Sequence, residues 1–327
     1  MTRIEKMTLP LFKTGFPILL APMAGFTDMT YRSICREHGC DFTFTEMISA
    51  KGLKYGGKSA DLMETAPNER PCGIQLFGRD PDIMAEMARR ICGENKGELA
   101  LIDINMGCPA PKITGNGEGS ALMKEPGVAA RVIEAVVNAS SLPVSVKFRK
   151  GWDDSHINCV EFARMAESSG AAFVTIHGRT REQMYSGTAD WDIIAEAKAA
   201  LFIPVIGNGD VTGGSSAIAM RDYTGCDGIM IARGALGNPY VFEEVRAALA
   251  GAPYSPPSNA ERLDLAIAHV RGLVAHKGSR GVIEMRKHIA YYVRGMKGAS
   301  AFRTAATLAP TAEALIGMIE EYKSSLE

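Results

Sequence analysis

The sequence predicts a closed parallel (β/α)₈ barrel of the TIM-barrel type, followed by a small all-helical C-terminal domain. Short apolar runs recur at a spacing of about 30 residues, which is typical of a strand plus a crossover helix. Eight such runs follow one another without a break, and this favours a closed barrel over an open doubly wound sheet. With 327 residues and 46% hydrophobic content, the chain can fill both cores.

The eight predicted strands are separated by stretches with a helical pattern. Such stretches cover residues 82–92, 128–139, 159–168, 193–200 and 215–221. The segment 251–259 contains three prolines and predicts a linker. We therefore expect a catalytic barrel over residues 1–250 and a helical domain over residues 251–327. The strands are expected to begin at Ile18, Phe42, Gly73, Ala100, Val144, Phe173, Val205 and Gly228.

Composition excludes several classes of protein. The formal net charge is −1, so any contact with nucleic acid has to come from a local basic surface. The seven cysteines form no CxxC pair and no Cys/His zinc spacing, which predicts a reducing cytoplasm and no bound metal. Neither a signal peptide nor an apolar run of about 18 residues is present, so we expect a cytoplasmic protein without a membrane partner. We separately expect a monomer.

A basic stripe is predicted in the C-terminal domain. At about 100° per residue, the helical pattern over residues 280–297 gathers its apolar side chains on one face. The adjoining face is cationic, and we interpret it as a binding surface for an anionic substrate. The apolar face consists of Val282, Met285, Ile289, Tyr292, Val293 and Met296, and the stripe of Arg286, Lys287, Arg294 and Lys297.

Polar side chains follow nearly every predicted barrel strand. In this fold the active site forms at the carboxyl ends of the strands, so we expect these residues to share one site. The candidates, in chain order, are Pro22, Met23, Ala24, Gln75, Asn105, Cys108, Lys147, Arg149, His177, Arg179, Asn208, Gly209, Asp210, Ala232 and Arg233.

Lys147 and the glycine-rich loops indicate an anionic cofactor. A buried ammonium is costly to desolvate unless it meets a negative charge, which a reduced flavin would supply at its pyrimidine edge. A structural salt bridge to Asp103 is the alternative. Gly209 and Gly234, with Arg233, suit a phosphate site after strands seven and eight, although they could simply form tight turns.

Three further residues have a chemical and a structural interpretation. The Cys108 thiol is protonated near neutral pH and could donate a proton, or it could be a packed turn residue. His177 could be a neutral hydrogen-bond donor to a cofactor or a core histidine. Arg149 could bind phosphate or uracil carbonyl oxygens, or be an ordinary charge.

Two motifs imitate nucleotide-binding sites. Residues 52–59 match GxxxxGK[ST], and residues 99–103 imitate a Walker B strand. A P-loop follows its strand directly, whereas the predicted second strand ends at Thr45, six residues before Gly52. Residues 115–120 lack the last glycine of GxGxxG, which argues against a dinucleotide site.

The ordered motifs resemble those of the tRNA-dihydrouridine synthases over essentially the whole chain, closest to the bacterial B-type branch. They are Ala-Pro-Met-Ala-Gly at 21–25, Thr-Glu-Met at 45–47, Gln-Leu-Phe-Gly at 75–78, Asp-Ile-Asn-Met-Gly-Cys-Pro at 103–109, Thr-Ile-His-Gly-Arg-Thr at 175–180, Gly-Asn-Gly-Asp at 207–210, Gly-Ala-Leu-Gly-Asn-Pro at 234–239 and Met-Arg-Lys-His at 285–288.

The resemblance implies reduction of specific tRNA uridines to 5,6-dihydrouridine with FMN as bound cofactor and NADPH as reductant. A flipped uridine would receive hydride at C6 from the flavin and a proton at C5 from Cys108. Asn105 and Arg149 would orient the base, and the basic stripe would contact tRNA. Ala232 stands where glycine often precedes the arginine, and the loop 112–119 carries little positive charge. The residues expected on FMN are Pro22, Met23, Ala24, Gln75, Lys147, His177, Asn208, Gly209, Asp210, Ala232 and Arg233.

Two other functions fit part of this pattern. A barrel flavoprotein acting on a free pyrimidine, such as a dihydroorotate dehydrogenase, would share much of the flavin pocket. The basic helical domain favours a macromolecular substrate instead. A non-catalytic RNA-binding protein is disfavoured, because each expected active-site position keeps a polar group.

Overall fold

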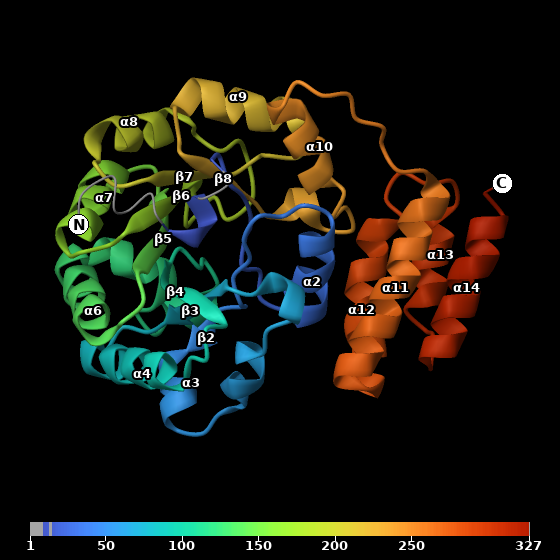
Figure 1. Ribbon diagram of the computed structural model, residues 1–327, viewed down its shortest axis with the longest axis horizontal. Helices are drawn as coiled ribbons and strands as arrows, with labels where there is room; N and C mark the ends of the chain where they lie inside the picture. The colour runs from blue at the N-terminus through green and yellow to red at the C-terminus, as the bar shows by residue number, and fades with distance from the viewer. Residues whose placement is uncertain (1–8, 13–14, 327) are drawn as a thin grey trace.

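The chain forms a barrel of parallel strands beside a C-terminal helical bundle, and this confirms the predicted fold class (Figure 1). The computed structural model describes residues 9–12 and 15–326. The strands are β1 (Ile18–Leu20), β2 (Ile48–Ser49), β3 (Cys72–Phe77), β4 (Leu99–Met106), β5 (Val144–Gly151), β6 (Phe173–Thr180), β7 (Val205–Asn208) and β8 (Gly228–Ile231).

The barrel closes between its first and third strands through residues 42–45. Phe42 bridges Leu19 of β1, and Phe44 bridges Gly73 of β3, both in parallel. We predicted a regular second strand from Phe42, and this was wrong. The regular strand is β2, whose Ile48 pairs with Leu76 of β3.

Side-chain hydrogen bonds explain the irregular backbone at residues 42–45. The Gln75 backbone N–H donates to the hydroxyl of Thr45 over 3.0 Å, where a regular ladder would use a carbonyl. The Thr43 hydroxyl donates to Glu69 over 2.8 Å. Threonines that bond in this way compete with the ladder, and apolar periodicity does not reveal the competition.

Helices surround the barrel. Because each helix connects two parallel strands, the carboxyl ends of all strands lie at one end of the barrel. Apolar side chains such as Ile74, Ile104 and Val146 are fully buried inside this core. The helices are α2 (Met29–Glu37), α3 (Ala50–Lys54), α4 (Pro81–Glu94), α5 (Pro111–Thr114), α6 (Pro126–Ala139), α7 (Cys159–Ser168), α8 (Asp192–Ala200), α9 (Gly214–Thr224) and α10 (Val241–Leu249).

The C-terminal bundle has an apolar core of its own, which includes Leu263, Met285 and Ile319. Its first helix begins at a capping box, in which Ser258 accepts from the backbone N–H of Glu261 and the Glu261 carboxylate accepts from that of Ser258. The helices are α11 (Asn259–Lys277), α12 (Ser279–Tyr292), α13 (Ala299–Ala306) and α14 (Ala312–Ser324).

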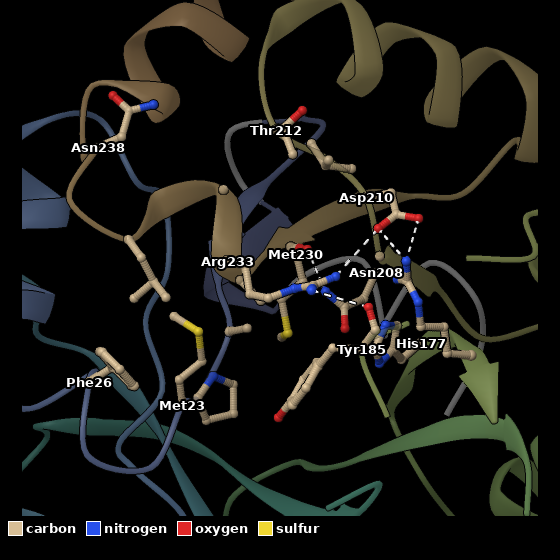
Figure 2. Close-up of a pocket in the computed structure, with 18 of the residues that line it drawn as sticks. Met23, Phe26, His177, Tyr185, Asn208, Asp210, Thr212, Met230, Arg233 and Asn238 are labelled. Carbon is tan, nitrogen blue, oxygen red and sulfur yellow. Dashed lines mark hydrogen bonds and ion pairs between the residues drawn. The ribbon is translucent and has the colours of Figure 1, made fainter. Parts of the chain in front are cut away.

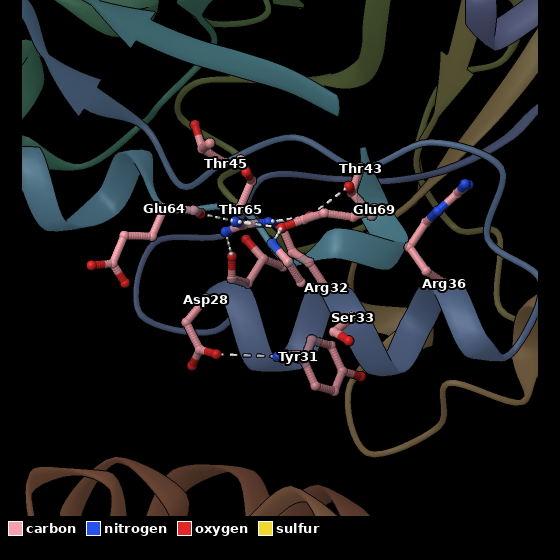
Figure 3. A network of polar contacts seen from close by, with 12 residues as sticks. Asp28, Tyr31, Arg32, Ser33, Arg36, Thr43, Thr45, Glu64, Thr65 and Glu69 are labelled. Carbon is pink, nitrogen blue, oxygen red and sulfur yellow. Dashed lines mark hydrogen bonds and ion pairs between the residues drawn. The ribbon is translucent and has the colours of Figure 1, made fainter. Parts of the chain in front are cut away.

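Helix α2 connects the barrel to the bundle. On its barrel side, Arg32 forms a buried ion pair with Glu69 at 2.8 Å and donates to the carbonyl oxygen of Glu64 (Figure 3). On its other side, Tyr31 lies against the rings of His269 in α11 and His288 in α12. Helix α2 therefore carries contacts from the barrel core to the bundle core.

No helix within residues 9–12 and 15–326 combines the length and apolar character that crossing a membrane requires.

Candidate functional site

A cavity of about 1090 Å³ lies at the carboxyl ends of the barrel strands. Figure 2 shows Met23 and Phe26 on one side of it, with Tyr185, His177 and Asp210 on the other. The bundle contributes Arg262 and Arg294 to the lining, so the cavity lies between the two parts of the chain.

Most of the residues predicted for the site line this cavity. Gln75 is fully buried outside the lining, and Arg286, Lys287 and Lys297 also lie outside it. The predicted residues in the lining are Pro22, Met23, Ala24, Asn105, Cys108, Lys147, Arg149, His177, Arg179, Asn208, Gly209, Asp210, Ala232, Arg233 and Arg294.

The lining is basic although the chain carries a formal net charge of −1. Concentrated positive charge with low-dielectric walls attracts anionic ligands. The cavity is therefore a local basic surface of the kind that a chain without net positive charge needs in order to bind a polyanion. Its cationic residues are Lys147, Arg149, Arg179, Arg233, Arg262 and Arg294, against the carboxylates of Asp210 and Glu244.

Lys147 brings an ammonium group without a carboxylate partner into the cavity. Its Nζ donates to Oδ1 of Asn208 over 3.1 Å, and among the described residues no carboxylate oxygen lies within 4.0 Å of Nζ. The Asn208 amide is oriented by its second bond, to the carbonyl oxygen of Met230 over 2.7 Å. Burial lowers the pKa of Lys147 to about 8, and the nearby Arg149 acts in the same direction.

The salt bridge between Lys147 and Asp103 is not formed. Asp103 instead accepts from Ser145 and from Gln75, both over 2.6 Å, beneath the cavity floor. Burial raises the pKa of Asp103 to about 6. Lys147 is left with the neutral Asn208 as its partner, so its positive charge is available to a ligand.

A chain of hydrogen bonds runs from Asp103 to the backbone of Cys108. The Gln75 amide donates to Asp103, and its oxygen accepts from the Asn105 amide over 2.8 Å. Oδ1 of Asn105 accepts from the backbone N–H groups of Gly107 and Cys108 over 3.1 and 2.9 Å. Asn105 therefore shapes the turn that presents Cys108, and Gln75 holds Asn105 in place.

The Cys108 thiol lies at the cavity wall and is half-buried. Burial raises its pKa, whereas the positive charges of Arg149 and Lys147 lower it by a smaller amount. The sulfur is therefore a thiol at neutral pH. The two cations would also stabilise the thiolate left after the loss of its proton.

Arg149 is locked in place by backbone carbonyls. Its guanidinium donates to Gly107 over 2.8 Å, to Thr180 over 2.8 Å and to Met184 over 2.9 Å. Burial lowers its pKa to about 10. Of its nitrogens, Nη2 makes no hydrogen bond within the described residues and can serve a ligand.

Asp210 organises two arginines on the wall of the cavity. Its carboxylate pairs with the buried Arg179 at 2.8 Å and lies 3.7 Å from the half-exposed Arg233. It also accepts from the backbone N–H of Ala189 over 2.7 Å. These bonds hold Asp210 in a left-handed backbone conformation, φ +59°, which is uncommon for residues other than glycine.

His177 and Gly209 fit closely together. Burial and the surrounding arginines and lysine keep the pKa of His177 well below its ordinary value, so the ring is neutral. A Cβ on Gly209 would lie 2.7 Å from Cβ of Ala189 and 3.0 Å from Cδ2 of His177. Glycine therefore lets this backbone, at φ +120°, approach the imidazole.

Comparison with known proteins identifies the family. The family profile described as "Dihydrouridine synthase (Dus)" matches residues 19–325. The chain belongs to the dihydrouridine synthase family. This confirms the family predicted from the motifs and the enzyme class, an oxidoreductase.

Curated relatives cover most of the chain. The chain is 42% identical to the "Probable tRNA-dihydrouridine synthase 1" of Synechocystis sp.. This similarity covers 88% of the chain and 80% of the relative. The chain is 40% identical to the "tRNA-dihydrouridine synthase B" of Xanthomonas campestris pv. campestris, over 94% of this chain and 93% of that one. A solved mandelate oxidase structure is 17% identical and covers 72% of this chain and 74% of its own, with a TM-score of 0.48.

Sequence reasoning did not select Tyr185, which lines the cavity of this dihydrouridine synthase. The residue is 52% exposed, and the centre of its ring lies 5.8 Å from Cζ of Arg149 and 5.2 Å from Cζ of Arg233. Tyr185 belongs to the loop after β6, where apolar periodicity has ended. The only sequence signal was its proximity to the polar end of that strand.

The stripe predicted on the last helices does not form one continuous face. Helix α12 ends at Tyr292, so Arg294 and Lys297 follow the helix instead of continuing it. Arg286 donates inward to the carbonyl oxygen of Ala309 over 3.1 Å, and the Lys287 ammonium lies over the ring of Phe26. Arg294 is exposed and reaches the cavity of the enzyme.

Proposed function

We propose that the chain reduces uridines in tRNA to 5,6-dihydrouridine, with FMN held in the cavity and NADPH as reductant. The observation that carries the proposal is the meeting of three groups in one cavity. These are the Cys108 thiol, the Lys147 ammonium and the bundle side chain Arg294. Membership of the family and the names of the relatives support the same conclusion.

The chemistry of the cavity fits a flavin phosphate. Lys147 carries a positive charge that no carboxylate of the described residues pairs with, and the neutral His177 can donate one hydrogen bond. Gly209 and the half-exposed Arg233 lie in the loops after β7 and β8, where this fold commonly binds phosphate. The proposed FMN set is Pro22, Met23, Ala24, Lys147, His177, Asn208, Gly209, Asp210, Ala232 and Arg233, with Gln75 supporting the set from below.

The protein's own groups perform the acid step of the reaction. Once reduced by NADPH, bound FMN would supply the hydride that C6 of the uracil ring receives. Cys108 then donates its proton to C5, so that one C=C bond is lost and two C–H bonds form. Lys147 and Arg149 stabilise the resulting thiolate, which recovers its proton from water.

The size and position of the cavity suit a base presented by a macromolecule. Its volume of about 1090 Å³ exceeds that of most sites for a single small ligand, roughly 300–1,000 Å³, so a flavin and a base can share it. A uridine has to leave the RNA stack to reach Cys108. Arg262 and Arg294 of the bundle lie at the same cavity, where the flanking phosphates would pass.

Single-turnover reoxidation of the pre-reduced protein by unmodified tRNA, without oxygen, tests this function. Cys108→Ala should keep its flavin and its tRNA affinity but reoxidise more slowly, by a factor on the order of 10² to 10⁴. Cys92→Ala is the matched control, because this thiol bonds to Ser140 away from the cavity. Wild-type rates and full dihydrouridine formation by Cys108→Ala would assign the proton to another donor. A wild-type protein that binds no FMN would overturn the proposed function itself.

A further inference from the structure

Three buried groups with metal-binding atoms meet where the barrel contacts the bundle. Asp28 precedes α2 as its N-cap, His269 belongs to α11 and His288 to α12. One ligand atom from each lies within 4.8 Å of those of the other two. The exposed fractions of the three residues are 4%, 0% and 0%.

These groups have unused hydrogen-bonding capacity. Nε2 of His269 and both ring nitrogens of His288 are buried and have no hydrogen-bond partner among the described residues. Oδ2 of Asp28 also accepts no hydrogen bond, although the Lys277 ammonium lies 3.4 Å from it. Buried polar atoms are normally bonded. Three unbonded imidazole nitrogens beside a carboxylate oxygen therefore point to a ligand that satisfies them together.

Hydrogen bonds orient two of the three groups. Oδ1 of Asp28 accepts from the backbone N–H of Tyr31 over 3.1 Å, which leaves Oδ2 without a hydrogen bond (Figure 3). Nδ1 of His269 lies 3.1 Å from the hydroxyl of Tyr292, which leaves Nε2 free. A hydrogen bond at the second imidazole nitrogen is the usual support of a metal-binding histidine.

Two lysines lie beside the cluster. The charged neighbours are Lys277, whose Nζ lies 3.4 Å from Asp28 and 2.7 Å from Glu284, and Lys287. Lys277 is closer to Glu284 than to Asp28, so the Asp28 carboxylate can also bind a metal ion.

We propose that Asp28, His269 and His288 bind one Zn²⁺ ion that fastens the bundle to the barrel. Two imidazole nitrogens and a carboxylate oxygen are typical zinc ligands, and a water molecule can complete a tetrahedron. Zinc–nitrogen bonds of about 2.0–2.1 Å place tetrahedral ligand atoms roughly 3.3 Å apart, so ligand atoms that lie within 4.8 Å of one another have to close in by at most about 1.5 Å. This site lies outside the cavity lining and does not depend on the reaction proposed for it.

The three residues are too far apart in the sequence to form a recognisable zinc-binding motif. The histidines belong to two different helices, and Asp28 comes from the opposite end of the chain. The expectation of no metal rested on Cys/His pairs close in sequence, whereas this cluster forms only when α2 packs on α11.

Elemental analysis of the flavin-loaded, tag-free protein tests the proposal after dialysis against Zn²⁺ and then against metal-free buffer. We expect one zinc per chain, and a melting temperature raised by roughly 4 °C at about a hundredfold excess of free Zn²⁺ over its Kd. A wild-type protein that retains no zinc and melts at the same temperature with and without Zn²⁺ overturns the proposal. The three groups then form only a polar contact between the barrel and the bundle.

Conservative variants locate the ion. Asp28→Asn keeps the N-cap, because asparagine caps as well as aspartate, and removes only the charged ligand. Asp28→Asn and His288→Gln should each lower the retained zinc at least tenfold. His156→Gln, which alters an exposed histidine beside Asp153, should retain the wild-type amount. Zinc retention unchanged in both cluster variants would place the ion elsewhere and overturn the assignment.

Discussion

Replacing Lys147 by methionine is expected to stabilise the barrel while weakening its hold on FMN. Burial lowers the pKa of this ammonium from 10.5 to about 8, and each pKa unit corresponds to about 1.36 kcal/mol. The charged lysine therefore costs the flavin-free fold about 2 to 3 kcal/mol at neutral pH, since part of the side chain is open to the cavity. Methionine has a similar length and no charge to desolvate, so Lys147→Met should recover about this amount.

The sign of the pH dependence follows from the same two values. Between about pH 8 and 10.5 the unfolded chain holds the Lys147 proton and the folded chain does not, so the stability of the wild type rises with pH. The advantage of Lys147→Met should be complete below pH 8 and fade as the pH approaches 10.5.

Urea unfolding of the flavin-free proteins measures this difference. Both tryptophans, Trp152 and Trp191, lie in the barrel, so their fluorescence reports the barrel without the bundle. Lys198→Met is the control, because Lys198 is ion-paired with Asp227 and its loss should destabilise the fold. Equal stability of Lys147→Met and wild type at neutral pH, or a gap that stays constant up to about pH 10, would refute the argument.

Three other substitutions test separate parts of the structure. Asn105→Ala should slow single-turnover dihydrouridine formation about tenfold at unchanged FMN content, because the turn before the thiol loses about 1.4 kcal/mol of hydrogen bonding. Arg294→Glu should weaken tRNA binding and lower the slope of log affinity against log salt by about 1 in filter-binding titrations. Arg32→Met should destabilise the barrel by about 3 to 5 kcal/mol in urea unfolding, because Glu69 then stays buried and unpaired.

Each of these outcomes has a control that could contradict it. Loss of FMN from Asn105→Ala would mean that the cofactor site, not the turn, had changed. Arg286→Glu should lower the melting temperature but leave the salt slope unchanged, because Arg286 is bonded to Ala309. An equal effect of Arg286→Glu and Arg294→Glu on the slope would contradict the different roles assigned to them. Glu69→Met added to Arg32→Met should restore part of the lost stability; no recovery would exclude the buried charge as the cause.

The sequence alone determined the barrel and the approximate membership of its site. Parallel strands bring their carboxyl ends to one edge, so residues that follow apolar runs have to converge. Asn105, Lys147, His177 and Asn208 meet in this way without any long-range information. The same local reasoning failed at residues 42–45, because the Thr45 hydroxyl accepts the hydrogen bond from the Gln75 N–H that a backbone carbonyl would accept in a regular strand.

Only the tertiary structure decided what each side chain in the site can still do. Arg149 and Gln75 both carry groups that could bind a ligand. Backbone carbonyls already accept most of the hydrogen bonds of the Arg149 guanidinium, and the Gln75 amide is bonded to Asp103 and Asn105. Tyr185 comes from an irregular loop, and the cluster of Asp28 and His288 joins opposite ends of the chain. Periodicity describes which face of an element is apolar. The hydrogen bonds and charges between elements depend on distances that exist only after the barrel has closed and the bundle has packed against it.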